Sequence, residues 1–143
     1  MRRLFLLRHG ETAHNKDQII QGGGVDSVLN QTGRGQAQQF FARYQAHPFT
    51  AVVASSLRRT QETLAPFAEA GHRVQAHPGL NEIHWGHYEG RRYDAALQAE
   101  VAHVREAWAA GDFDYPVPGG EAPNQVLRRA TAALEDVLAA HPE

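Results

Sequence analysis

Near its start the chain carries a short apolar run that passes directly into charged and flexible residues. Leu4-Phe5-Leu6-Leu7 is typical of a buried strand, and Arg8-His9-Gly10 follow it at once. A strand end that presents a guanidinium and an imidazole beside a glycine, which permits a sharp turn, is a place where an anion can be held and attacked. This feature predicts a sheet with an anion site at its edge.

Strand-like runs alternate with helical patterns along the rest of the chain. Further strands are expected at 51–54 and 73–76, and helices at about 30–44, 57–70, 93–110 and from Pro123 onward. The alternation predicts an α/β fold, a three-layer sandwich with a mostly parallel central sheet flanked by helices. Ligands bind at the carboxyl ends of such strands, so residues that follow the first two strands are expected to face one crevice.

Length and composition limit the partners that the chain can have. At 143 residues it has the size of one domain, and its formal net charge of −2 favours neither nucleic acid nor a membrane surface. The apolar run at 4–7 is shorter than the roughly 7–15 residues of a signal-peptide core. The sequence contains no cysteine, which suits the cytoplasm. We expect a single cytoplasmic domain over residues 1–143, with no nucleic-acid or membrane partner.

A second polar and basic cluster follows the expected strand at 51–54. Ser55-Ser56 precede a helix whose first turn contains Arg58-Arg59, so hydroxyl groups and free backbone N–H groups gather there. Basic residues are unfavourable at the positively polarised start of a helix, which favours an anionic partner for one of these arginines. The guanidinium fork matches phosphate oxygens well. The two strand ends together therefore predict a phosphate site.

Several segments, taken in order, resemble the histidine phosphatase superfamily, the phosphoglycerate mutase-like proteins, from residue 4 to the end of the chain. The matching segments are Leu7-Arg8-His9-Gly10-Glu11-Thr12, the loop with Asn15 and Gln21-Gly22, the helix start Leu29-Asn30-Gln31-Thr32-Gly33, Ser55-x-Leu57-x-Arg59-Thr60-x-x-Thr63, residues 80–90 with Glu82, and Pro118-Gly119-Gly120-Glu121. The family has a serine after the last of these, where this chain has Ala122. Ordered motifs at family-like spacing are a strong signal, although any one of them alone would be weak.

The resemblance implies a role for each matching residue. His9 aligns with the family's nucleophile, and Glu82 aligns with its general acid and base. The residues that would bind phosphate are Arg8, Asn15, Gln21, Gly22 and Arg59. The family pattern implies no metal and no other cofactor, and its ligands are a small phosphorylated metabolite or a free phosphate-like oxyanion. His84 and His87 would suit a metal only on a shared helical face, and Gly86 between them indicates a loop.

Residues 84–120 are expected to cover the pocket. In the family the corresponding insertion lies over the phosphate site and selects the leaving group, and here it carries Trp85, Tyr88 and Trp108. Simple core packing is an equally good interpretation for Trp108 and its helix.

The resemblance implies metal-independent hydrolysis of small phosphomonoesters through a phosphohistidine on His9. Arg8 and Arg59 would favour the neutral imidazole by repulsion, which leaves a ring nitrogen free to attack phosphorus. Phosphoglycerate mutase-type phosphoryl transfer, with the same phosphohistidine, is one alternative. A phosphate-binding fragment without turnover is another.

The last alternative depends on the end of the family pattern. The family follows its last helix with a strand and a second histidine, in a Ser/Thr-His-Gly motif that these 143 residues do not contain. The expected strands are also fewer than the average of about 5–6 in a sheet. We therefore expect a domain that is truncated at its C-terminus, in which an exposed strand edge would allow a homodimer.

Overall fold

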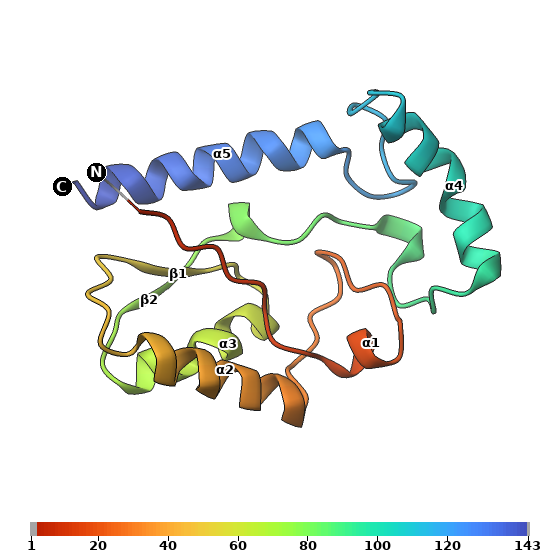
Figure 1. Ribbon diagram of the computed structural model, residues 1–143. Helices are drawn as coiled ribbons and strands as arrows, with labels where there is room; N and C mark the ends of the chain where they lie inside the picture. The colour runs from red at the N-terminus through yellow and green to blue at the C-terminus, as the bar shows by residue number, and fades with distance from the viewer. Residues whose placement is uncertain (1–2, 143) are drawn as a thin grey trace.

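The computed structural model describes residues 3–142, and within them helices surround a small parallel sheet (Figure 1). The helices are α1 (Ala13–Lys16), α2 (Gln31–Tyr44), α3 (Arg58–Glu69), α4 (Ala95–Ala109) and α5 (Pro123–Ala140), with 3-10 turns η1 (Pro78–Leu80) and η2 (Gly86–Tyr88). The strands are β1 (Val52–Ala54) and β2 (Val74–Ala76). Every helix that the sequence predicts is present, and α1 is a short addition.

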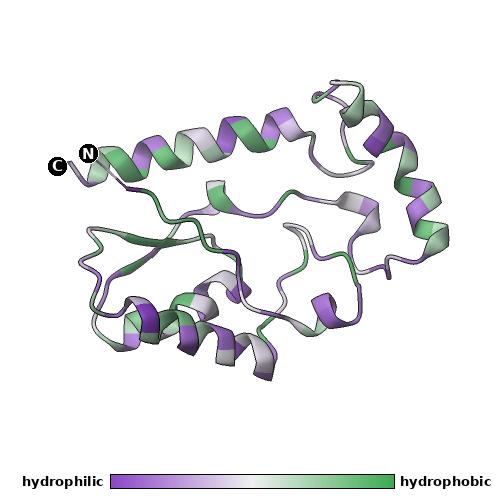
Figure 2. Ribbon diagram, in the orientation of Figure 1, coloured by the Kyte–Doolittle hydropathy of each residue, from purple (hydrophilic) through white to green (hydrophobic). Residues whose placement is uncertain are grey.

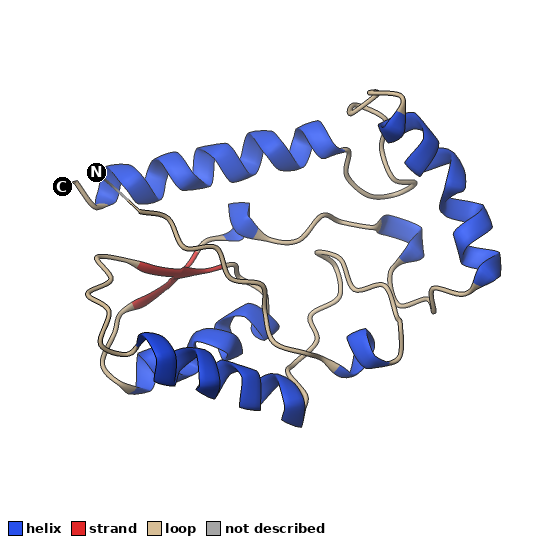
Figure 3. Ribbon diagram, in the orientation of Figure 1, coloured by secondary structure: helices blue, strands red, loops and turns tan. Residues whose placement is uncertain are grey.

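The two strands confirm the predicted α/β class. They pair in parallel, with Val52 opposite Val74 and Ala54 opposite Ala76, and α3 connects them along the chain. Figure 3 shows the strands between α2 and α3 on one side and α5 on the other. This arrangement gives the helix–sheet–helix layering expected from the sequence.

The strand expected at 4–7 is a wrong prediction. Residues 3–10 have no strand hydrogen bonding to the rest of the described chain, and Leu4 and Leu6 are 65% and 85% exposed. An apolar run supplies strand propensity, but a strand forms only where a neighbour accepts and donates its backbone hydrogen bonds. The segment has no regular secondary structure, and Phe5 packs against an aromatic cluster. The ring centroids of Phe5 and Phe49 lie 5.4 Å apart.

Local signals at the helix ends explain why the helices begin and end where they do. The Asn30 side chain accepts a hydrogen bond from the backbone N–H of Gly33 at the start of α2, and Asp94 caps α4 in the same way at Leu97. Gly71 and Gly111 follow α3 and α4 with φ of +94° and +90°, a conformation that L side chains rarely adopt. The predicted ranges 57–70 and 93–110 end directly before these two glycines, which terminate the helices.

The described residues form two apolar clusters, one half-buried around Phe67 and one fully buried around α4. The first is aromatic and joins α2 and α3 to the segment before β1, with members Phe40, Phe41, Tyr44, Phe49 and Phe67. The second lies around α4 and contains Tyr88, Leu97, Val101, Val104 and Val117. Trp108 packs against this second cluster and donates from its indole N–H to the Tyr115 carbonyl, so the core-packing interpretation of Trp108 is confirmed.

Figure 2 shows hydrophobic and hydrophilic residues alternating along α5, as expected of a helix with one buried face. Among residues 3–142, none of the helices combines the length and apolar character needed to cross a bilayer.

Candidate active site

A single pocket of about 340 Å³ gathers all the site residues predicted from the sequence. It is lined by Arg8, His9, Asn15, Gln21, Gly22, Arg59 and Glu82, together with Ile19, Ile20, Trp85, Tyr93, Val101 and Arg105. These residues come from the N-terminal segment, α1 and the loop after it, α3, the loop after η1, and the region of α4. Distant segments therefore converge on one pocket, as predicted. Of the two segments expected to be strands that lead into it, only β1 is a strand, and residues 4–7 are not.

His9 is half-buried, and its ring has a defined orientation. Its Nδ1 lies 2.8 Å from the carbonyl oxygen of Gly10. A carbonyl can only accept, so Nδ1 carries the proton and Nε2 carries the lone pair. Burial is the largest cause and lowers the pKa of His9 below its ordinary value of 6.5. The Gly10 hydrogen bond opposes this shift, the charges of Arg59 and Arg8 add to it, and Glu82 opposes it least. The expected repulsion is present, but burial is the larger cause.

Gly10 is required for a reason other than the expected sharp turn. A Cβ at this position would lie 2.6 Å from the carbonyl oxygen of Gly33, so the chain after His9 passes directly over the first turn of α2. The Gly10 N–H donates to the buried hydroxyl of Thr63, 2.9 Å away, and that hydroxyl donates to the Arg59 carbonyl at 2.7 Å. The backbone beside His9 is thereby attached to α3.

Arg59 is 1% exposed and supplies the buried positive charge of the pocket. Its Nη1 donates to the Val25 carbonyl at 2.8 Å, and its Nη2 donates to the Gly22 carbonyl at 2.9 Å. The Nε atom is buried and has no hydrogen-bond partner among the described residues. An oxyanion would satisfy this N–H, because a buried donor is seldom left unpaired. Arg58 instead lies exposed beside Glu62, and Arg59 lines the pocket whereas Arg58 does not.

The start of α3 does not provide the free backbone amides expected there. The N–H of Ser56 donates to Asn81 at 2.9 Å, and the N–H of Arg58 donates to Asp26 at 2.7 Å. Neither Ser55 nor Ser56 lines the pocket. Side chains from distant loops already occupy the positively polarised helix start, and the pocket is built on arginine side chains instead.

The polar loop after His9 is held by a compact hydrogen-bond network. Thr12 caps α1, and its hydroxyl also donates to the Gln21 side-chain oxygen at 3.0 Å. Ser27 donates to the same oxygen of Gln21. Asn15 closes the capping box by accepting from the Thr12 backbone N–H at 3.0 Å. Asn15 and Gln21 thus reach the pocket from a pre-ordered loop.

Glu89 supports the Gly22 side of the pocket, a role that the sequence analysis missed. Its side chain is largely buried, and Oε1 accepts from the N–H groups of Trp85 at 2.8 Å and Gly24 at 3.2 Å. Gly22 has φ of +60°, and a Cβ there would collide with the Glu89 carboxylate. Glu89 therefore links the glycine loop to the segment that follows Glu82.

Glu82 is exposed and stands on a loop between η1 and η2. Its Oε1 accepts from the backbone N–H of the next residue, Ile83, at 3.1 Å. The exposed Glu82 carboxylate thus lines the pocket that also contains His9 and Arg59.

A family model for the histidine phosphatase superfamily (branch 1) matches residues 4–143. The chain belongs to this superfamily. The family assignment made from the ordered motifs is therefore confirmed.

Members of the superfamily from several bacteria are similar to this chain. A probable phosphoglycerate mutase GpmB of Erwinia tasmaniensis is 37% identical over 139 residues, which cover 96% of this chain and 64% of the relative. Among solved structures, a mycobacterial glucosyl-3-phosphoglycerate phosphatase in complex with VO3 has a TM-score of 0.81 at 29% identity, with 94% of this chain and 66% of that one covered. Bacillus stearothermophilus YhfR has a TM-score of 0.80 with the same identity and coverage. The chain spans 64% of the length of the curated relatives that it matches.

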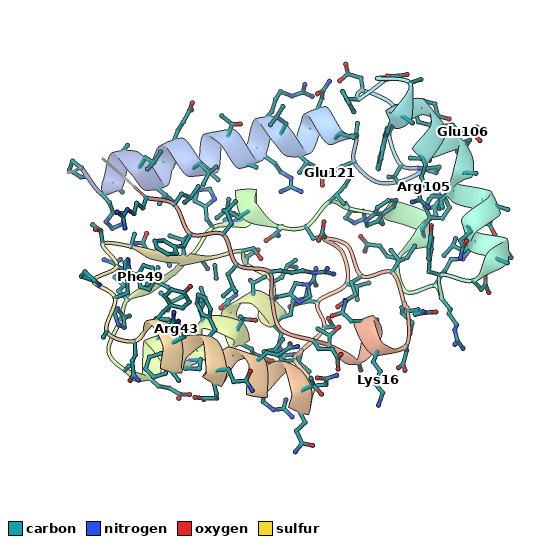
Figure 4. All side chains as sticks on the ribbon, viewed as in Figure 1. Lys16, Arg43, Phe49, Arg105, Glu106 and Glu121 are labelled. Carbon is teal, nitrogen blue, oxygen red and sulfur yellow. The ribbon has the colours of Figure 1, made fainter. Side chains whose placement is uncertain are left out.

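Within this histidine phosphatase-superfamily fold, α4 also contributes to the pocket through a residue that the sequence analysis missed. Arg105 stands on α4 (Figure 4) and donates from Nη1 to the Tyr93 hydroxyl at 2.5 Å. Both residues line the pocket. Neither belongs to a motif, so only their spatial position reveals them. Among residues 3–142 no group of three or more His, Cys, Asp or Glu side chains is placed to hold a metal ion, and His84 lies beside Glu89.

Proposed function

We propose that the protein hydrolyses small phosphomonoesters without a metal ion, through a phosphohistidine on His9 and with Glu82 as general acid and base. The observation that carries the proposal is one pocket that combines a half-buried imidazole of lowered pKa, a buried arginine with an unpartnered N–H, and a carboxylate. Phosphoryl transfer needs positioning and charge neutralisation more than covalent help. These groups supply both.

In the first half of the proposed reaction, Nε2 of His9 attacks phosphorus, and the bond between phosphorus and the ester oxygen breaks. Arg8 and Arg59 stabilise the charge on the non-bridging oxygens. The remaining phosphate contacts come from Asn15, Gln21 and Gly22. The departing alkoxide takes the proton of the protonated Glu82 carboxyl group, so that the alcohol leaves and the phosphoryl group stays on His9.

In the second half, Glu82 is a carboxylate and takes a proton from water. The water oxygen attacks phosphorus, the bond between phosphorus and Nε2 breaks, and phosphate leaves. His9 is again neutral and Glu82 again protonated. The lowered pKa of His9 supports this cycle because only the neutral imidazole has a lone pair on Nε2.

In this proposal residues 84–120 cover the pocket and select the leaving group. Trp85, Tyr93, Val101 and Arg105 come from this segment and line the pocket beside the proposed catalytic residues. They offer apolar surface and one cation to the part of the substrate that departs. This combination suits a small phosphorylated metabolite.

Phosphoglycerate mutase-type transfer is the second candidate, because the curated relatives carry that name. It would use the same phosphohistidine and return the phosphoryl group to a bound acid. The short stretch between Glu82 and α5 favours hydrolysis. Dependence on a bisphosphorylated primer, with little release of free phosphate, would identify the mutase.

Phosphate release from an aryl phosphate tests the proposal, with a chelator present and His9→Ala assayed in parallel. Chelator-resistant release that disappears in His9→Ala supports the phosphohistidine route. Release that survives His9→Ala overturns it. A folded chain that binds vanadate but releases no phosphate supports the remaining alternative, a phosphate-binding unit without turnover.

A further inference from the structure

Arg129 of α5 binds the loop that carries Glu82 through its whole guanidinium group. Nη1 donates to the carbonyl oxygens of Gly79 at 2.9 Å and Asn81 at 2.6 Å, and Nη2 donates to the Glu82 carbonyl at 3.1 Å. Nε and Nη2 also donate to the two carboxylate oxygens of Glu121, at 2.7 and 2.8 Å. A guanidinium has five N–H donors, and each has an acceptor here.

Because all five N–H groups of Arg129 are engaged, the cavity around Arg129 offers no free guanidinium donor to a ligand. The cavity has a volume of about 310 Å³ and is lined by Asn81, Glu82, His84, Glu121 and Arg129, among others. An arginine whose N–H groups are all engaged has no donor to spare for an anion. We therefore assign no ligand to this cavity. We call Arg129 and Glu121 the clamp, since together they hold the Glu82 loop.

Glu121 completes the clamp from the turn before α5 (Figure 4). Besides its bidentate pair with Arg129, its Oε2 accepts from the His84 N–H at 2.9 Å, and its own N–H donates to the His84 carbonyl at 2.9 Å. Arg129 thus holds the backbone up to Glu82, and Glu121 holds it from His84 onward. Bidentate arginine–carboxylate pairs impose a fixed geometry as well as binding energy.

The position of the Glu82 side chain follows the loop backbone, because the hydrogen bond that its carboxylate accepts comes from the N–H of Ile83 in the same loop. Glu82 is exposed, and it stands on a loop that lies outside any helix or strand. A general acid must lie within hydrogen-bond reach of the leaving oxygen, and a displacement of about 1 Å costs on the order of 10²-fold in rate. The backbone of the loop therefore decides where the proposed proton donor sits.

We propose that Arg129, paired with Glu121, is a positioning residue that places Glu82 for proton transfer. This inference rests on the role of Glu82 in the proposed function. Arg129 touches no substrate in this arrangement and acts through the carbonyl groups of the loop.

The test compares Arg129→Met with Arg128→Met, which removes the same charge from an exposed neighbouring position on α5. The substrates are an aryl phosphate, whose leaving group needs little protonation, and an alkyl phosphate, whose leaving group needs a proton. Arg129→Met is expected to lower kcat for the alkyl phosphate by about 10- to 100-fold, with a smaller loss for the aryl phosphate and little change in KM. Arg128→Met is expected to change neither. Equal losses on both substrates overturn the proposal, since a merely structural defect does not depend on the leaving group.

A double-mutant cycle separates this inference from the proposed function. If Arg129 acts through Glu82, Arg129→Met adds little to the loss already caused by Glu82→Gln. A full extra loss in the Glu82→Gln background overturns the positioning role. If Glu82→Gln costs no activity, the proposed function itself is wrong.

Backbone hydrogen exchange supplies a readout that does not require turnover. Residues 79–84 are expected to exchange faster in Arg129→Met than in Arg128→Met, while the exchange of α2 and α3 stays the same. Equal exchange over residues 79–84 in the two variants overturns the proposal, whatever the activity.

Discussion

The backbone N–H of Gly10 donates a hydrogen bond to the hydroxyl of Thr63, with 2.9 Å between nitrogen and oxygen. Gly10 follows His9, and Thr63 lies one helical turn after Arg59 on α3, so this bond joins the two halves of the proposed phosphate site. The Thr63 hydroxyl in turn donates a hydrogen bond to the Arg59 carbonyl oxygen at 2.7 Å. A single buried side chain therefore sets the position of His9 relative to Arg59.

Thr63→Val is expected to destabilise the protein by about 1–3 kcal/mol, because it leaves the buried Gly10 N–H without an acceptor. Thr63→Ser keeps the hydroxyl and serves as the control, with a smaller loss. Urea unfolding of both variants measures the difference. A loss in Thr63→Val no larger than that in Thr63→Ser would contradict the prediction, because only Thr63→Val removes the hydroxyl that accepts from Gly10.

Gly22→Ala is expected to destabilise the protein more than Gly71→Ala. Both glycines have positive φ, +60° and +94°, which costs an alanine about 1–2 kcal/mol. A Cβ at Gly22 also meets the largely buried carboxylate of Glu89, whereas a Cβ at Gly71 has nothing within 4 Å. The difference between the two urea midpoints isolates the collision, and coinciding midpoints would contradict it.

The ring of His9 is expected to titrate below the 6.5 of an unperturbed histidine, because burial and two nearby arginines disfavour its charged form. Titration of the ring resonances by NMR measures the midpoint. Arg8→Met, which changes an exposed residue, is expected to raise the pKa of His9 toward 6.5. A wild-type midpoint at or above 6.5 would refute the expected environment.

The same lowered pKa predicts how stability changes with pH. Above about pH 6.5 His9 is neutral in both the folded and the unfolded chain and contributes no pH dependence. Below that pH the unfolded chain binds the proton more readily, so the free energy of unfolding falls as the pH falls. His9→Gln is expected to lose less stability than the wild type between pH 7 and 5, and urea unfolding at several pH values measures this. Identical pH profiles would contradict the prediction.

Arg59→Met is expected to weaken vanadate binding by about 10- to 100-fold, the effect of losing a hydrogen bond from a charged donor. It also leaves the carbonyl groups of Gly22 and Val25 without their donors, so some loss of stability is expected. Arg58→Met, on the exposed side of the same helix turn, is expected to leave binding unchanged. Calorimetric titration with vanadate compares the two variants, and similar affinities would rule out Arg59 as the principal cation of the site.

Structural elements were predicted correctly where the residues that determine them lie within the element itself. The helix patterns at about 30–44, 57–70 and 93–110 depend on periodicity and on end signals that act within a few residues, and α2, α3 and α4 are all present. The run at 4–7 has a similarly clear pattern, yet no strand forms there, because a strand depends on a partner that the pattern of one segment does not contain. The proposed site residues converge on one pocket because each motif carries its own polar residue to the same side of the fold.

Residue types and their spacing were sufficient for the family, the α/β class and the pocket residues that lie in motifs, since these depend on short motifs and on periodicity within single elements. They were not sufficient for Tyr93 and Arg105, which line the pocket but belong to no motif. Tertiary packing decided which His9 nitrogen is free, that Gly10 is required by the approach of Gly33, and that Glu121 and Arg129 clamp the Glu82 loop. Each of these features depends on burial or on a hydrogen bond whose geometry exists only after distant parts of the chain have folded together.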